Sequence, residues 1–107
     1  MAEMITTGIW MVEESKQDAF LEEWAAFAGW ASAMTGAETL RIGRDVADPS
    51  RFVSFGAWES ADVVHAWKAH PEFRDRIARV LQHVDQFHPS ELHGLALATA
   101  GTGTLTP

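Results

Sequence analysis

Residues 51–58, RFVSFGAW, carry apolar side chains at both odd and even positions and contain the β-branched and aromatic residues that favour strands. The residues before them, DPS at 48–50, are typical of a turn. Further back, residues 40–46, LRIGRDV, place Leu40, Ile42 and Val46 among polar side chains. These stretches predict a β-hairpin whose second strand is apolar on both faces.

A strand and a helix are predicted before the hairpin. Residues 4–12, MITTGIWMV, have the composition of a strand. Ser15 is a candidate N-cap for a helix over 16–34, in which apolar residues recur with helical spacing. The apolar stripe of this helix consists of Phe20, Trp24, Phe27, Ala31 and Met34. Gly36 then suits the position just past a helix C-terminus.

A broken helix and a strand are predicted after the hairpin. Ser60 is placed to cap a short helix that Pro71 ends, and Pro71 also suits the first position of a second helix. Apolar residues keep helical spacing in this second helix, at Phe73, Ile77, Val80, Leu81 and Val84. Residues 91–98, ELHGLALA, are predicted to form the last strand.

This order of elements is the βαββαβ unit of a ferredoxin-like α+β fold with a four-stranded antiparallel sheet. We expect one domain over residues 1–98 and a flexible C-terminal tail over 99–107, which is rich in Thr and Gly. The helices suffice to cover one face of the sheet, yet the strands are apolar on both faces. We therefore expect a homodimer in which the second face packs against the sheet of another copy.

The composition argues against several partners and chemistries. The 107 residues include 8 Lys+Arg and 15 Asp+Glu, a net charge of −7, which disfavours binding to nucleic acid or an anionic membrane surface. There is no cysteine, which excludes disulfides, thiolate nucleophiles and cysteine-ligated metals. The five histidines include no pair at the helical i,i+4 spacing, so no metal site is expected. With no visible signal peptide or membrane-spanning run, we expect a cytoplasmic protein.

Several short motifs carry a resemblance to a known family. They are DPSRFV at 48–53, WES at 58–60, AW at 66–67 and PEF at 71–73. Together with the order of elements, they resemble the antibiotic biosynthesis monooxygenase (ABM) family over residues 4–98. The resemblance implies a dimeric α+β barrel with a pocket between sheet and helices. Members include oxygenases that act on aromatic polyketides without metal or flavin, and also haem-degrading enzymes.

At single positions the resemblance is partial. Trp58 stands where the polyketide oxygenases have a tryptophan, but Ser54 and Val64 replace their asparagine and tyrosine. Trp67 matches the tryptophan of the haem-degrading members, whereas Ile77 replaces their haem-ligating histidine. We therefore expect the family's fold, no haem degradation and no bound cofactor.

The candidates for a site are aromatic rings and one histidine. Val63, Trp67 and His70 follow helical spacing and share one face of the helix after Ser60, whereas His65 should point to water. We expect Trp58 and Trp67 to be catalytic pocket walls and His70 to be the general base that takes a phenolic or enolic proton. The remaining substrate-binding candidates are Trp10, Trp24, Phe27, Val63 and Phe73.

These residues favour a small cofactor-independent monooxygenase that binds an aromatic or polyketide-like molecule in an apolar pocket. Dioxygen is a triplet, so an electron-rich substrate anion must first pass it an electron, and the protein has only to favour and shield that anion. A non-oxidative polyketide cyclase, or a small-molecule-binding protein of the same fold, is the alternative. For each single ring, filling the core is the alternative to lining a pocket.

Overall fold

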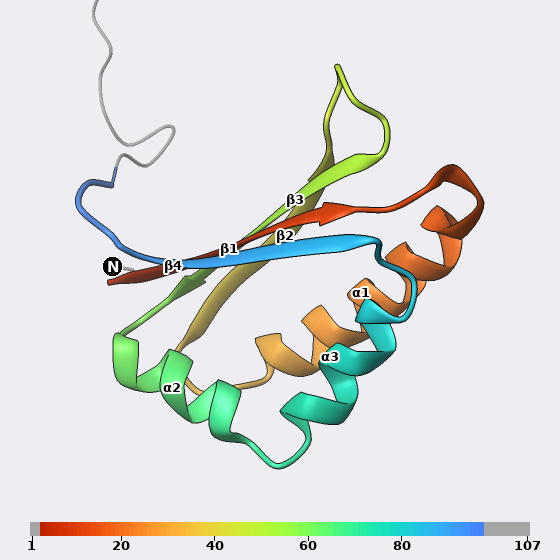
Figure 1. Ribbon diagram of the computed structural model, residues 1–107. Coiled ribbons are helices and arrows are strands. Elements are labelled where there is room, and N and C mark those ends of the chain that lie inside the picture. Colours follow the sequence, from red (N-terminus) through yellow and green to blue (C-terminus); the bar gives the residue numbers. More distant parts are fainter. Residues whose placement is uncertain (1–2, 98–107) are drawn as a thin grey trace, which may run out of the picture.

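The computed structural model describes residues 3–97, in which helices cover one face of a four-stranded sheet (Figure 1). The elements are β1 (Met4–Met11), a short 3-10 helix η1 (Glu14–Lys16), α1 (Gln17–Ser32), β2 (Ala37–Arg44), β3 (Arg51–Trp58), α2 (Ala61–Ala69), α3 (Phe73–Leu81) and β4 (Gln86–His93). The strands are ordered β2-β3-β1-β4, and every neighbouring pair is antiparallel. The predicted ferredoxin-like α+β fold is confirmed, while the predicted tail over 99–107 lies outside the described residues.

The predicted hairpin of β2 and β3 forms, but β2 ends two residues earlier than expected. The second strand ends at Arg44, and Val46 is fully exposed in the loop. The Asp45 carboxylate accepts hydrogen bonds from the backbone N–H groups of Ala47 at 2.7 Å and Asp48 at 3.2 Å, and it pairs with Arg51 at 2.9 Å. These backbone hydrogen bonds, followed by the contact with Arg51, lower the pKa of Asp45. Hydrogen bonds from an Asp side chain to the following backbone stabilise a turn, so the alternation of apolar and polar side chains in β2 ends before Val46.

The start of α1 differs from the prediction. Ser15 lies in η1 and its hydroxyl donates to the Glu13 carboxylate at 2.8 Å, so it does not cap α1. The helix begins at Gln17, whose buried side-chain amide donates to the carbonyls of Val12 at 3.0 Å and Pro49 at 2.9 Å. Gln17 therefore ties the end of β1 to the β2–β3 loop, a long-range contact that local capping rules do not predict.

The break between α2 and α3 is longer than predicted, because Pro71 does not begin the second helix. Ser60 caps α2 as expected, because its hydroxyl accepts from the N–H of Val63 at 3.3 Å. The helix ends at Ala69, and His70 has the extended backbone angles φ −59° and ψ 137°. Pro71 lies in the turn that follows, and α3 begins two residues later, at Phe73.

The last strand is placed five residues earlier than the sequence predicts. It runs from Gln86 to His93 and pairs with the whole of β1, from Met11↔Gln86 to Met4↔His93. The apolar run that suggested residues 91–98 contains Leu95, which is almost fully exposed. Pairing with β1 decides the position, because it satisfies the backbone groups of residues 86–93 along one edge.

The two faces of the sheet have different surroundings, as the two-sided apolar pattern predicts. On the covered face the buried apolar residues in the strands or just after β1 are Met4, Trp10, Val12, Phe52 and Trp58, which pack with Phe20, Trp24, Phe27, Val64 and Val80 from the helical side. On the other face no helix of the described chain lies over the sheet (Figure 1). Apolar side chains there remain half-buried or exposed, and Phe55 is 51% exposed.

Candidate functional site

The site begins with four small residues at the centre of the covered sheet face. Thr6 and Gly8 on β1 lie opposite Gly56 and Ser54 on β3 in the register of the sheet. Larger pairs stand at both ends of this floor, namely Trp10↔Phe52 and Met4↔Trp58. Since side chains on one face of a strand alternate with those on the other, small residues at these positions leave a hollow under the helices.

Two tryptophans lie over the floor, each bonded to one of its hydroxyls. The indole Nε1–H of Trp10 donates to Ser54 Oγ at 2.9 Å, and that of Trp58 donates to Thr6 Oγ1 at 2.9 Å. The bonds satisfy both buried indole donors and fix the two rings in place. The hydroxyl of Ser54 donates no hydrogen bond to any other residue of 3–97, so its proton is available to a ligand.

Glycine is required beside each of these pairs. A Cβ on Gly8 would stand 2.8 Å from Trp10 Nε1 and 2.9 Å from Ser54 Oγ. A Cβ on Gly56 would stand 2.7 Å from Trp58 Nε1. A larger residue at either position would displace a tryptophan ring, so the two glycines set the shape of the floor.

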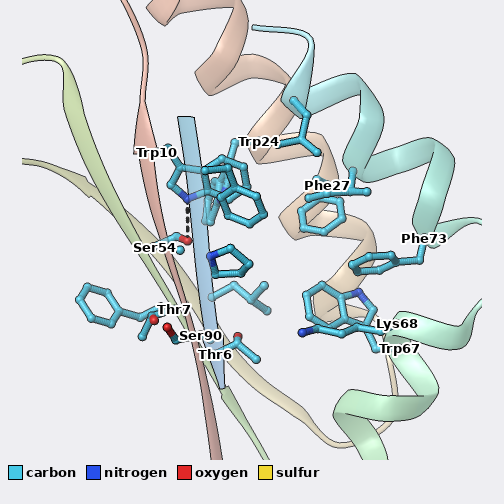
Figure 2. Close-up of a pocket in the computed structure, with 18 residues that line it drawn as sticks. Thr6, Thr7, Trp10, Trp24, Phe27, Ser54, Trp67, Lys68, Phe73 and Ser90 are labelled. Atoms are coloured by element: carbon cyan, nitrogen blue, oxygen red, sulfur yellow. Dashed lines mark hydrogen bonds between the residues drawn. The ribbon is translucent and has the colours of Figure 1, made fainter. Parts of the chain in front are cut away.

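Aromatic rings form the walls of a cavity of about 320 Å³ above this floor (Figure 2). Trp10 stacks on Phe87 with a centroid separation of 4.0 Å, and Trp67 stacks on Trp58 at 4.4 Å. Trp67 also meets Phe73 edge to face at 5.0 Å. The side chains of the helical wall are Trp24, Phe27, Trp67, Lys68, Phe73, Ile77 and Leu81. A cavity of this size with flat aromatic walls fits a small aromatic molecule.

Charge in the cavity comes from one side chain. Among the described lining residues Lys68 is the only charged one, and no His, Asp or Glu lines the cavity. The Lys68 ammonium group forms an ion pair with Glu91 of β4 at 3.4 Å. The other polar side-chain groups of the lining are hydroxyls and the indole N–H groups of the tryptophans, of which the buried Trp67 Nε1–H has no hydrogen-bond partner within residues 3–97. Binding would therefore depend mainly on shape and apolar contact.

Most of the predicted substrate-binding residues line the cavity. Trp10, Trp24, Phe27 and Phe73 do so, and Trp67 of the predicted catalytic set does as well. These residues come from β1, α1, α2 and α3, so the fold brings together side chains that are distant in the sequence.

Trp58 and Val63 are not on the cavity surface. Trp58 is fully buried and lies behind Trp67, where it supports the wall from outside. Val63 is half-buried and packs toward Gly36, where its side chain closes the space beside the positive-φ turn after α1. Both positions are therefore structural in the described geometry.

His70 also lies outside the cavity lining, contrary to the expected placement. Helical spacing put it on the face of Trp67, but the chain leaves the helix at His70, so helical geometry no longer fixes its direction. Its ring packs edge to face against Trp30 at 5.3 Å, and its Nδ1 accepts from the N–H of Glu72 at 3.1 Å. His65 is exposed, as predicted.

Several lining residues were not among the candidates. The floor of Thr6, Gly8, Ser54 and Gly56 has a sequence signal, since small residues occupy alternate positions between bulky ones in both strands. Lys68 has no such signal, because a lysine on a short helix is usually solvated. Only the fold brings it to the cavity and to Glu91.

Within residues 3–97 no three His, Asp or Glu side chains lie close enough to hold a metal ion. None of the helices in this range is long and apolar enough to cross a membrane. The cytoplasmic location inferred from the sequence stays a prediction.

An antiparallel ferredoxin-like sheet with an aromatic cavity under its helices places the chain among small two-layer α+β domains. The family model for antibiotic biosynthesis monooxygenase matches residues 5–79, and the chain belongs to this family. The resemblance read from the sequence is thereby confirmed. No curated protein sequence matches the chain.

Solved structures agree on the fold. A variant of SnoaB, a cofactor-independent oxygenase from Streptomyces nogalater, superposes with a TM-score of 0.80 at 15% identity, covering 94% of this chain and 99% of its own. A candidate antibiotic biosynthesis monooxygenase from Nitrosomonas europaea gives 0.75 at 20% identity, covering 87% and 99%. One from Deinococcus radiodurans gives 0.79 at 18% identity, covering 92% and 99%. At these identities the similarity establishes the fold alone.

Proposed function

We propose that the protein is a small oxygenase that takes a flat, electron-rich aromatic molecule into the cavity and oxidises it with dioxygen, using neither metal nor flavin. The observation that carries this proposal is the cavity of about 320 Å³ with aromatic walls and a narrow polar floor. Family membership and the fold shared with a cofactor-independent oxygenase support it.

The substrate itself supplies the electrons for this reaction, so the protein has only to bind, orient and shield it. An anthrone, as a model substrate, loses the two hydrogens of its methylene group and gains one oxygen atom, while the second oxygen atom leaves as water. The substrate enolate supplies the electrons, and dioxygen accepts them. The cavity would hold the enolate flat between Trp67 and the opposite aromatic wall and keep it out of water. The free hydroxyl proton of Ser54 would donate to a substrate oxygen.

The experiment uses dithranol, a dihydroxyanthrone, and follows oxygen uptake together with the absorbance of the anthraquinone product. We expect the protein to accelerate oxidation above the spontaneous rate, with one dioxygen consumed per quinone, and to do so in the presence of a metal chelator. Acceleration that disappears with the chelator would contradict the proposal.

Binding without turnover is the alternative, and one observation favours it. No His, Asp or Glu lines the cavity in the described residues, so the usual acid–base side chains are not at hand for catalysis. Tight binding of dithranol with no acceleration of its oxidation would establish a ligand-binding protein, and a cyclised product from a poly-β-ketone would establish a cyclase.

Substitution of His70 tests the base predicted from the sequence. Because the ring packs on Trp30 and Nδ1 accepts from Glu72, we expect His70→Ala to change the rate of dithranol oxidation by less than about two-fold, compared with the 10²–10⁴-fold that a general base contributes. His65→Ala, which removes an exposed histidine of α2, is the matched control. A loss of two or more decades for His70→Ala alone would establish His70 as the base.

We also propose that the uncovered sheet face forms a homodimer. The face presents Ile5, Ile9, Val53, Phe55 and Leu92 side by side, from three adjacent strands. An apolar sheet face of this extent is costly to leave in water. Packing against the same face of a second copy would remove it from solvent and keep two-fold symmetry.

The variant Phe55→Asp tests dimer formation without disturbing the fold of the protomer. Since Phe55 is 51% exposed in the protomer, a carboxylate there leaves the core intact but would be buried without a partner at the dimer interface. We expect the wild type to sediment as a dimer and Phe55→Asp as a folded monomer with unchanged near-UV circular dichroism. Val46→Asp, in the exposed β2–β3 loop, should remain dimeric. A monomeric wild type at micromolar concentration would rule the dimer out.

A further inference from the structure

The ion pair between Lys68 and Glu91 lies at the edge of the cavity. Lys68 is on α2 and Glu91 on β4, and their charged groups are 3.4 Å apart. Within residues 3–97 no other side-chain hydrogen bond or ion pair joins α2 to β4. Figure 2 shows the Lys68 side chain running beside Trp67, with its nitrogen extended toward the sheet.

This ion pair contributes little to the stability of the fold. The Lys68 and Glu91 side chains are 35% and 37% exposed. Ion pairs this open to water contribute about 0–1 kcal/mol, because water screens the attraction and both long side chains lose conformational freedom. Breaking the ion pair therefore costs little free energy when another anion binds the ammonium group.

The position of Lys68 favours a ligand anion as that alternative partner. It carries the only charge among the described lining residues, and Glu91 is the only carboxylate within 4.0 Å of its nitrogen in residues 3–97. An anion held among aromatic rings would have lost much of its hydration, so a nearby cation interacts with it more strongly than in water. The stem of Lys68 lies against an apolar wall, which suits a lysine whose charged end reaches into a partly dry space.

We propose that Lys68 binds the oxyanion of an aromatic phenol or enol in the cavity, and that Glu91 holds Lys68 at the edge until the ligand arrives. The cavity thus selects acidic hydroxylated aromatics and binds them in their ionised form. The inference rests on the proposed function, because it names the chemical class of that ligand. On binding, the O–H bond of the ligand breaks and its proton passes to solvent water. The resulting anion is the species that can pass an electron to dioxygen.

Alizarin, a dihydroxyanthraquinone, provides a direct test because its absorbance changes when it ionises and it is not consumed. The apparent pKa of bound alizarin is measured by absorbance titration with saturating protein and a metal chelator. A cation beside a phenol favours the ionised form, so the pKa of the bound dye should lie below its value in buffer. Replacing Lys68 by methionine keeps the apolar stem and removes the charge. We expect Lys68→Met to raise the pKa of the bound dye by about 1–2 units.

Two further variants complete the test. Glu91→Gln removes the competing carboxylate, so it should lower the pKa of the bound dye below the wild-type value and tighten binding of the anion. Lys16→Met is the matched control, since Lys16 is the other lysine of the chain and lies outside the cavity lining. We expect it to bind alizarin with the wild-type pKa.

The outcomes separate this inference from the proposed function. If alizarin binds but Lys68→Met leaves its pKa at the wild-type value, Lys68 does not bind the oxyanion, while the aromatic cavity stands. If Glu91→Gln raises the pKa of the bound dye, Glu91 does not compete for Lys68 and the second half of the inference is wrong. If alizarin and dithranol both fail to bind the wild-type protein, the proposed function falls and this inference falls with it.

Discussion

Replacing Trp58 by alanine is expected to lower the free energy of unfolding by about 3–5 kcal/mol, as for other fully buried aromatic side chains. Trp58 is fully buried, stacks on Trp67 at 4.4 Å and donates its indole N–H to Thr6 at 2.9 Å. The substitution leaves a cavity behind the wall and removes a hydrogen bond at once. This loss is a substantial part of the roughly 5–15 kcal/mol by which a typical domain is stable. Urea unfolding followed by circular dichroism measures it.

Trp58→Phe is the control for this prediction. It keeps a ring to stack on Trp67 but cannot donate to Thr6, so it should cost about 1–2 kcal/mol, chiefly from the lost hydrogen bond and the smaller ring. The ordering wild type, Trp58→Phe, Trp58→Ala is therefore expected in unfolding midpoint. A cost of less than about 1 kcal/mol for Trp58→Ala would mean that the second tryptophan of the stack does not support the wall.

The local parts of the fold could be predicted because local chemistry decides them. Residues 51–58 form β3 as expected, and the Ser60 hydroxyl caps α2. Apolar residues at both odd and even positions of β1 and β3 also indicated that both faces of the sheet carry apolar side chains. In each case the decisive interaction lies within a few residues of the pattern, or depends only on the two-residue period of a strand.

The sequence-based predictions are wrong where contacts with distant residues determine the boundary of an element. The apolar stretch 91–98 predicts the last strand there, whereas pairing with β1 selects 86–93. The start of α1 depends on Gln17, whose amide reaches the carbonyl of Pro49 in another loop. Neither partner is visible from the local sequence, so propensity and spacing could not place these boundaries.

In the candidate site, too, residues set by local spacing were predicted and residues set by distant contacts were not. Trp24, Phe27 and Phe73 follow from helical spacing and line the cavity as expected. His70 does not, because the helix ends one residue before it and its backbone becomes extended. Lys68 gains its position only through the approach of α2 to β4, which no spacing rule describes. Sequence reasoning therefore found the apolar walls and missed the charge.

Replacing Trp67 by alanine is expected to weaken binding of a tricyclic aromatic ligand by about 5- to 150-fold. Stacking of an aromatic ligand on an aromatic side chain contributes about 1–3 kcal/mol, and each 1.4 kcal/mol corresponds to a tenfold change in Kd. Trp67 lines the cavity and is held flat by Trp58 behind it and by the Phe73 ring at its edge. A ligand would therefore find this ring already oriented, without loss of side-chain freedom. The affinity for alizarin, measured by fluorescence quenching or calorimetry, tests the prediction.

The matched control for Trp67 is Trp30→Ala. Phe27 and Phe73 pack against both tryptophans, at 5.7 and 5.0 Å from Trp67 and at 6.0 and 6.5 Å from Trp30. Trp30, however, is half-buried outside the cavity lining, and the Arg76 guanidinium lies over its ring at 5.0 Å. Its loss removes a ring of the same size from the back of the same cluster, so it should reduce stability and leave the affinity within about two-fold of wild type. Equal loss of affinity in both variants would show that the cluster acts only as a support, and that the ligand does not stack on Trp67. A loss confined to Trp67→Ala would place the ligand against the ring that Trp58 and Phe73 hold in position.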